Sequence, residues 1–135
     1  MVDRTKAEML ESFEGLCEKV EEVPDQMKEN GRQIHIELKP DDEAILKDSK
    51  TGRFHEWLRI TDKTTDTSVP EGSKIDAYLK EIEVSMPSAK KAAKVFDAFK
   101  SMEGKRFKFV RKVLGKSFKG HEAKASFVPQ ILLEE

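Results

Sequence analysis

Residues 33–39 read QIHIELK, a run in which polar and apolar side chains alternate strictly. Ile34, Ile36 and Leu38 share one side of an extended chain, because successive side chains of a β-strand point to opposite faces. The same alternation returns in residues 54–60, after a stretch rich in turn-forming residues at 48–52. A short apolar run at 44–47 lies between them. These patterns predict an antiparallel meander of two or three strands.

The C-terminal third of the chain returns to the period of two. In residues 106–113, Phe107, Phe109 and Val113 are expected to face the core, with basic side chains between them. A last strand is expected at about residues 126–133. Pro129 has no backbone N–H to donate to a neighbouring strand, so this strand is predicted to lie at a sheet edge or to carry a bulge.

Two regions have helical patterns. Residues 3–22 carry apolar side chains at spacings of three and four with acidic residues between them, which predicts an amphipathic helix. We therefore expect residues 1–30 to form an N-terminal helix and linker, and residues 31–135 to form the folded domain. After loop-like residues 61–72, Ser73 is a candidate N-cap. The apolar spacing from 75 to 102 then predicts a helical insert of two helices, closed by Gly104.

The composition limits the class of protein. A chain of 135 residues with 37% hydrophobic residues can form one domain with a modest core. No stretch approaches the roughly 20 apolar residues of a membrane span, and the single cysteine, Cys17, cannot form an internal disulfide. We expect a cytoplasmic protein without a membrane partner. Abundant Lys and Glu with few amide side chains also resemble the composition of thermophile proteins.

The expected order of elements resembles the OB-fold family. A three-strand meander at about residues 32–60, a helical insert, and a final pair of strands ending near residue 133 follow the order of that five-stranded, partly open barrel. The fold class implied is α+β and mainly β: an OB-like barrel with an N-terminal helix and a helical insert between strands 3 and 4. The family binds oligonucleotides on the face of strands 2 and 3 and with the loops joining strands 1–2 and 4–5.

Charge is strongly segregated along the chain. Residues 1–85 hold 13 basic and 21 acidic side chains, a net charge of −8, whereas residues 86–135 hold 12 and 5, a net charge of +7. In the basic part, positive charges alternate with aromatic rings at 105–112 and again at 115–120. Phosphates attract the cations, and unpaired bases can stack on the rings.

These residues lead to a functional hypothesis: binding of single-stranded DNA or RNA without catalysis. Basic side chains on one strand and on the following loop would neutralise phosphates: Arg106, Lys108, Lys112, Lys116 and Lys119. Trp57 and Phe118 would stack on bases, with Arg59 in support. The loop residues Lys116, Phe118 and Lys119 fall where the resembled family has its ligand-binding strand 4–5 loop.

Structural roles for the same residues are also open. Trp57 is as readily a core residue as an exposed one, and lysines beside a strand often protect a sheet edge against aggregation. The basic half can also pair with the acidic half. One alternative function is therefore a protein–protein adaptor or homodimer that uses the acidic N-terminal helix. Another is an enzyme or a small-molecule site lined by His35, His55 and carboxylates.

No catalytic or cofactor motif stands out. The sequence Gly115-Lys116-Ser117 ends like a phosphate-binding P-loop, but that motif requires a glycine where Val110 stands. No pair of histidines has the spacing of a zinc site, and no serine or cysteine nucleophile has a recognisable partner. We expect neither an enzyme nor a bound cofactor or metal.

Overall fold

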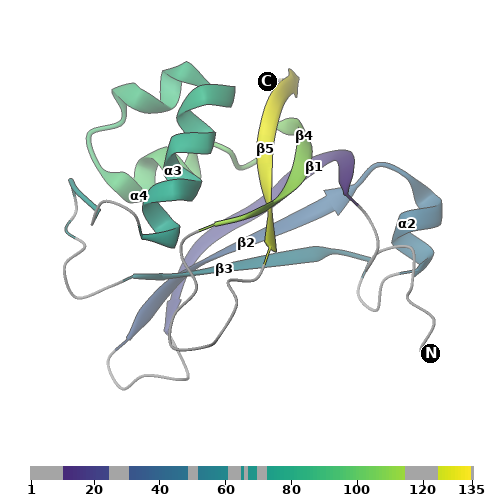
Figure 1. Ribbon diagram of the computed structural model, residues 1–135, viewed down its shortest axis with the longest axis horizontal. Coiled ribbons are helices and arrows are strands. Elements are labelled where there is room, and N and C mark those ends of the chain that lie inside the picture. Colours follow the sequence, from purple (N-terminus) through teal and green to yellow (C-terminus); the bar gives the residue numbers. More distant parts are fainter. Residues whose placement is uncertain are drawn as a thin grey trace.

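A computed structural model describes residues 11–24, 31–48, 52–60, 65, 67–69, 73–114 and 125–134 of the chain (Figure 1). In these residues five strands and three α-helices follow one another, with a short 3₁₀ helix between the last two helices. In chain order they are β1 (Ser12–Pro24), β2 (Arg32–Pro40), α2 (Glu43–Asp48), β3 (Phe54–Ile60), α3 (Lys74–Ser85), η1 (Pro87–Lys91), α4 (Val95–Lys100), β4 (Arg106–Val113) and β5 (Ala125–Glu134).

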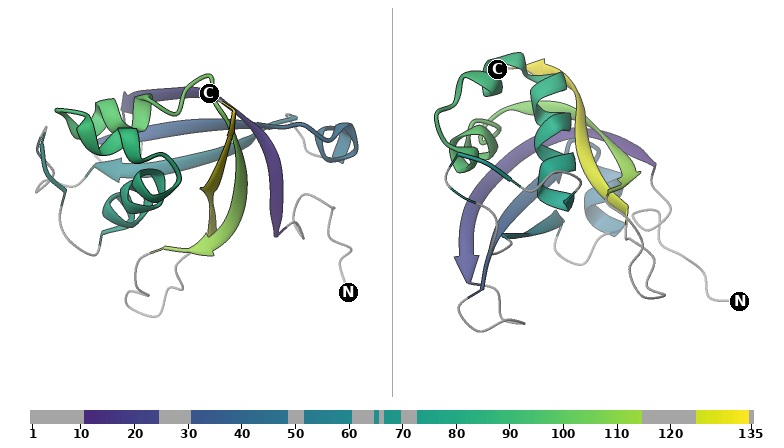
Figure 2. Two further views of the ribbon diagram at one scale, coloured as in Figure 1. Left: turned by 90° about the horizontal axis from the view of Figure 1, so that it is seen from above. Right: turned by 60° about the vertical axis from the view of Figure 1, so that its left-hand side comes forward.

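The strands form one antiparallel sheet in the order β3-β2-β1-β4-β5. The fold is therefore mainly β, as the alternating patterns predict, and the sheet is open, with β3 and β5 at its edges. It is also strongly bent: β2 and β3 run across the view of Figure 1, whereas β5 runs almost at right angles to them. Figure 2 shows β1 curving between these two directions. α3 and α4 lie at one end of the sheet and α2 at the other.

The predicted N-terminal helix is wrong, because Ser12–Pro24 forms β1, the central strand. Phe13, Gly15 and Cys17 are buried at a spacing of two, but the next buried position is Val20. The pairing of β1 with β2 shifts register between Cys17 and Lys19, where a β-bulge inserts an extra residue. The bulge turns one spacing of two into a spacing of three, and this irregularity imitates a helical period.

The short strand expected at residues 44–47 is also wrong, because these residues lie in helix α2. The carboxylate of Asp42 accepts a hydrogen bond from the backbone N–H of Ala44 at 2.9 Å, and its carbonyl accepts one from Ile45 at 3.1 Å. A side-chain acceptor at this position is typical of a helix N-cap. A run of four residues is too short to distinguish a strand from one helical turn.

Helix α3 packs against β5, and its side chains bond to the strand's backbone. The Tyr78 hydroxyl donates to the carbonyl of Phe127 at 2.8 Å, and the Ser85 hydroxyl donates to the carbonyl of Pro129 at 2.7 Å. Pro129 is thus in an edge strand, as its missing N–H predicts, and the β4–β5 register also shifts beside it. The helix therefore satisfies polar groups that an edge strand otherwise leaves open.

The core brings the two edges of the bent sheet together. The rings of Phe54 on β3 and Phe127 on β5 lie 4.9 Å apart, and Phe13 from β1 contacts both, at 5.0 and 4.9 Å between centroids. Phe107 and Phe109 are fully buried, as their place in the alternation predicts, whereas Val113 is 64% exposed because it lies at the open end of β4. Packing of aromatic rings, rather than backbone hydrogen bonds, thus joins β3 to β5 in the described residues.

Candidate functional site

A stack of three flat rings lies on the outer surface of β2 and β3. Trp57 is 47% exposed, and its ring lies 3.9 Å from the ring of His35, with 10° between the planes. His55 lies on the other side of His35, at 5.1 Å and 11°. We call Trp57, His35 and His55 the ring stack. Trp57 is the outermost member that offers a large aromatic surface to solvent.

The strand register explains why these rings meet. His35 on β2 pairs directly with Trp57 on β3 and with Glu21 on β1, so the three side chains form one row across the sheet. In the next row, Glu37 pairs with His55. Direct cross-strand neighbours have Cβ atoms about 4.5–5.5 Å apart, close enough for rings to contact. The stack is therefore a product of register.

Hydrogen bonds hold His35 in place. Its Nδ1 lies 3.0 Å from Oε1 of Glu21, and its Nε2 lies 2.9 Å from Nδ1 of His55. His35 is itself buried, so these contacts orient a ring that supports Trp57 from beneath. The hydrogen bond from His35 lowers the pKa of Glu21, and the ion pair with Lys19 at 3.3 Å acts in the same direction.

This surface combines an aromatic platform with balanced charge. In addition to the rings it carries two cations, Lys19 and Arg59, and two carboxylates, Glu21 and Glu37. Formal charge therefore sums to zero when both histidines are neutral. Any affinity for a nucleic acid at this surface must come largely from stacking on Trp57.

The basic positions of β4 are arranged differently. Arg106 forms an ion pair with Asp41, and Lys112 forms one with Glu81 at 3.0 Å. Lys108 stands directly opposite Glu14 of β1 in the register. These cations therefore do not form the unneutralised groove that the charge segregation suggests.

The remaining basic residue of β4 packs into the fold. The guanidinium of Arg111 lies over the ring of Phe127, 4.7 Å from its centroid. A cation at this distance is attracted by the electron-rich face of the ring. Arg111 therefore helps to hold β5 against β4.

The structure brings only some of the predicted residues together. Trp57 and Arg59 lie on the same face of β3, but β2 and β1 separate that strand from β4. Three strand spacings of ~4.8 Å put the two groups about 14 Å apart along the sheet. The predicted loop residues Lys116, Phe118 and Lys119 lie outside the described residues. Sequence reasoning missed His35 and Glu21 as supports of Trp57, because only the register reveals that they share its row.

A second titratable group lies on the inner side of β3. Burial raises the pKa of Glu56 to about 7, against the opposing influence of Lys74 and of a hydrogen bond with the backbone of Phe127. The carboxyl group thus links β3 to β5 beside the contact of Phe54 with Phe127. It also raises the pKa of the buried Tyr78 hydroxyl, after the larger effect of burial.

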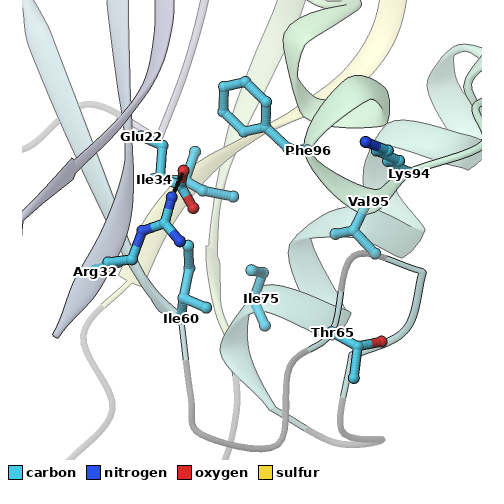
Figure 3. Close-up of a pocket in the computed structure, with 9 residues that line it drawn as sticks. All are labelled: Glu22, Arg32, Ile34, Ile60, Thr65, Ile75, Lys94, Val95 and Phe96. Atoms are coloured by element: carbon cyan, nitrogen blue, oxygen red, sulfur yellow. Dashed lines mark hydrogen bonds and ion pairs between the residues drawn. The ribbon is translucent and has the colours of Figure 1, made fainter. Parts of the chain in front are cut away.

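Between the sheet and the helices lies a small cavity of about 120 Å³ (Figure 3). Val95 and Phe96 of α4 face Ile34 of β2 across it, and an ion pair between Glu22 and Arg32 stands at its rim. Pockets that bind drug-sized ligands are usually larger, ~300 Å³ or more. Nothing in its lining points to a particular ligand.

Other chemistry has little support in the described part of the chain. Burial raises the pKa of the Cys17 thiol to about 12, which keeps it protonated and unreactive. Among the described residues, no three His, Cys, Asp or Glu side chains are placed to hold a metal ion. No helix within these residues has both the length and the apolar character needed to cross a membrane.

No known protein family matches the sequence, and comparison with curated proteins finds no match either.

Proposed function

We propose that this protein is an OB-like domain that binds single-stranded DNA or RNA through the outer surface of β2 and β3, with Trp57 as the stacking platform. The observation that carries the proposal is the exposed indole of Trp57, held flat against His35 by a row of cross-strand contacts. Stacking of one base on such a ring contributes about 1–3 kcal/mol and is tolerant of sequence.

The order of elements supports the OB-like assignment. With Ser12–Pro24 as the first strand, the chain has three strands, a helical segment, and two further strands. The open edges, β3 and β5, come together at Phe54 and Phe127, as in a partly open barrel. In the OB family, the face of strands 2 and 3 binds oligonucleotides, and here the ring stack lies on the second and third strands.

The charge distribution supports a site dominated by stacking. Arg59 lies on the same strand face as Trp57 and is suited to contact one phosphate, whereas Arg106 and Lys112 of β4 are engaged with carboxylates. Binding should therefore weaken only moderately with salt, by about 0.7 in the logarithmic slope for each phosphate contacted. In this proposal the β4 cations are secondary.

The test uses the only tryptophan of the chain as its own reporter. A single-stranded oligonucleotide should quench the emission of Trp57 when a base stacks on it. Trp57→Ala should weaken binding, measured by anisotropy of a labelled oligonucleotide, by roughly 5- to 100-fold, which corresponds to ~1–3 kcal/mol.

Val84→Ala is the matched control, because Val84 is 75% exposed on α3, away from the ring stack. It should bind as tightly as the unchanged protein. No detectable binding at low salt, or equal losses in both variants, contradicts the proposal.

A further inference from the structure

The ring stack contains a feature that simple stacking does not require: two imidazole nitrogens facing one another. Nε2 of His35 and Nδ1 of His55 lie 2.9 Å apart. At this distance a hydrogen bond needs one donor and one acceptor, so only one proton can sit between them. The state of one histidine therefore constrains the other.

Glu21 determines what the other nitrogen of His35 does. Its carboxylate lies 3.0 Å from Nδ1 of His35, and the same contact lowers the pKa of Glu21, so the carboxylate is an acceptor and Nδ1 carries a proton. Nε2 of His35 can then either accept from His55 or, when His35 is a cation, donate to it. In both arrangements the pair holds a charge of 0 or +1.

A second added proton changes the geometry. With both rings cationic, Nε2 of His35 and Nδ1 of His55 each carry a hydrogen, and the hydrogen bond between them is lost. Like charges on rings 5.1 Å apart also repel. His35 remains tied to Glu21, so His55 is the ring that separates.

We propose that the His35–His55 pair is a proton-sensitive switch in which the second proton releases His55 as a cation beside Trp57. This inference rests on the proposed function in one respect: the released cation strengthens binding to the phosphates of a single strand. The platform itself persists, because Trp57 stacks on His35 and not on His55 alone.

Neighbouring charges on this surface are compatible with such a switch. The charged groups around the pair are Glu21 and Lys19 on β1, Glu37 on β2 and Arg59 on β3. Glu37 pairs with His55 in the register and offers a partner for the cation after release. Histidine is the side chain that changes charge between pH 5 and 8, so the switch operates in that range.

The first experiment uses the free protein and needs no nucleic acid. Imidazole ring signals are followed by NMR from pH 8 to 5, together with the emission of Trp57. The two histidines should titrate as a coupled pair, in two steps, and His55→Gln should convert the titration of His35 into a single step. His121→Gln identifies the signal of the third histidine. Independent single-step titration of His35 in both proteins overturns the switch.

The second experiment measures affinity for a labelled single-stranded oligonucleotide at pH 7.5 and 5.5. Binding should be about twofold to fivefold tighter at the lower pH, as expected for one added surface ion pair. The logarithmic salt slope should steepen by about 0.7. His55→Gln should remove both changes and keep the binding seen at pH 7.5.

The two experiments separate the two proposals. Coupled titration without binding at either pH refutes the nucleic-acid function and leaves the switch. Binding that depends on Trp57 but is equal at both pH values refutes the switch and leaves the function. The complete pattern, coupled titration with pH-dependent binding abolished in His55→Gln, supports both.

Discussion

Carboxylates act in opposite ways on the two surfaces of this sheet that bear functional candidates. On β2 and β3, Glu21 orients His35, which in turn supports the exposed ring of Trp57. On β4, Asp41 and Glu81 pair with Arg106 and Lys112, so the most basic stretch of the chain presents little unneutralised charge there. Local sequence richness in a residue type is thus a poor guide to a site, because the neighbours brought by folding decide what that residue can do.

The largest effect should follow from a substitution that disturbs both surfaces at once. Gly15 pairs with β2 on one side and with β4 on the other, and a Cβ at this position would lie 2.4 Å from the carbonyl oxygen of Lys39. Because the obstacle is backbone, Gly15→Ala should destabilise the fold by about 3 kcal/mol or more in urea denaturation.

Gly104→Ala is the control for that variant. Gly104 has a φ of +84°, and a Cβ at this position would meet nothing within 4 Å, so only the left-handed backbone opposes a methyl group. The expected cost is ~1 kcal/mol. Equal losses for the two variants would show that β1 tolerates separation from its neighbours.

The second prediction concerns the seam between the two surfaces, where Glu56 of β3 meets β5. The pKa of this carboxyl is raised to about 7 in the folded protein, so the unfolded chain releases the proton more readily. The folded state therefore loses stability as pH rises from about 4.5 to 7, and the loss is complete above that range.

Glu56→Gln removes this penalty while keeping an oxygen that can accept from Phe127. At pH 8 the variant should be more stable by on the order of 3 kcal/mol, and near pH 4.5 the difference should vanish. Thermal melts at the two pH values measure it. Glu14→Gln, which changes an exposed carboxylate of β1, should show no such dependence, and a stability of Glu56→Gln below that of the unchanged protein at pH 8 contradicts the prediction.

The smallest effect is expected on β4. The charge of Lys112 is already matched by Glu81 at 3.0 Å, so Lys112→Gln should change affinity for a single strand by less than about twofold. The complementary variant, Glu81→Gln, releases the lysine and should steepen the salt slope by up to about 0.7. A loss on Lys112→Gln as large as that for Trp57→Ala would move the proposed site from β3 to β4.

Sequence patterns succeed here where structure is local and regular. The alternation at residues 33–39 and 54–60 predicts β2 and β3, and Ser73 is the N-cap of α3, accepting from the N–H of Asp76 at 3.2 Å. Pattern reasoning fails at β1, because a single bulge changes the period on which the prediction depends. It also fails at α2, where Asp42 caps a helix too short to show any period.

For the candidate site, alternation alone places Trp57, His55 and Arg59 on one face of a strand. The row of Glu21, His35 and Trp57 depends on register between strands that are distant in the chain, and the ion pairs of β4 depend on the same long-range arrangement. No local pattern specifies which carboxylate meets which cation. Such pairings have physical meaning only after the chain has folded.

The sequence by itself determined that this chain forms a mainly β domain with a helical insert, because hydrophobic periodicity is a local property of the chain. Tertiary structure decided that residues 12–24 are the central strand, that the β4 cations meet carboxylates, and that one histidine lies beneath the indole. These outcomes depend on register and on bending of the sheet, which arise from contacts between residues far apart in sequence.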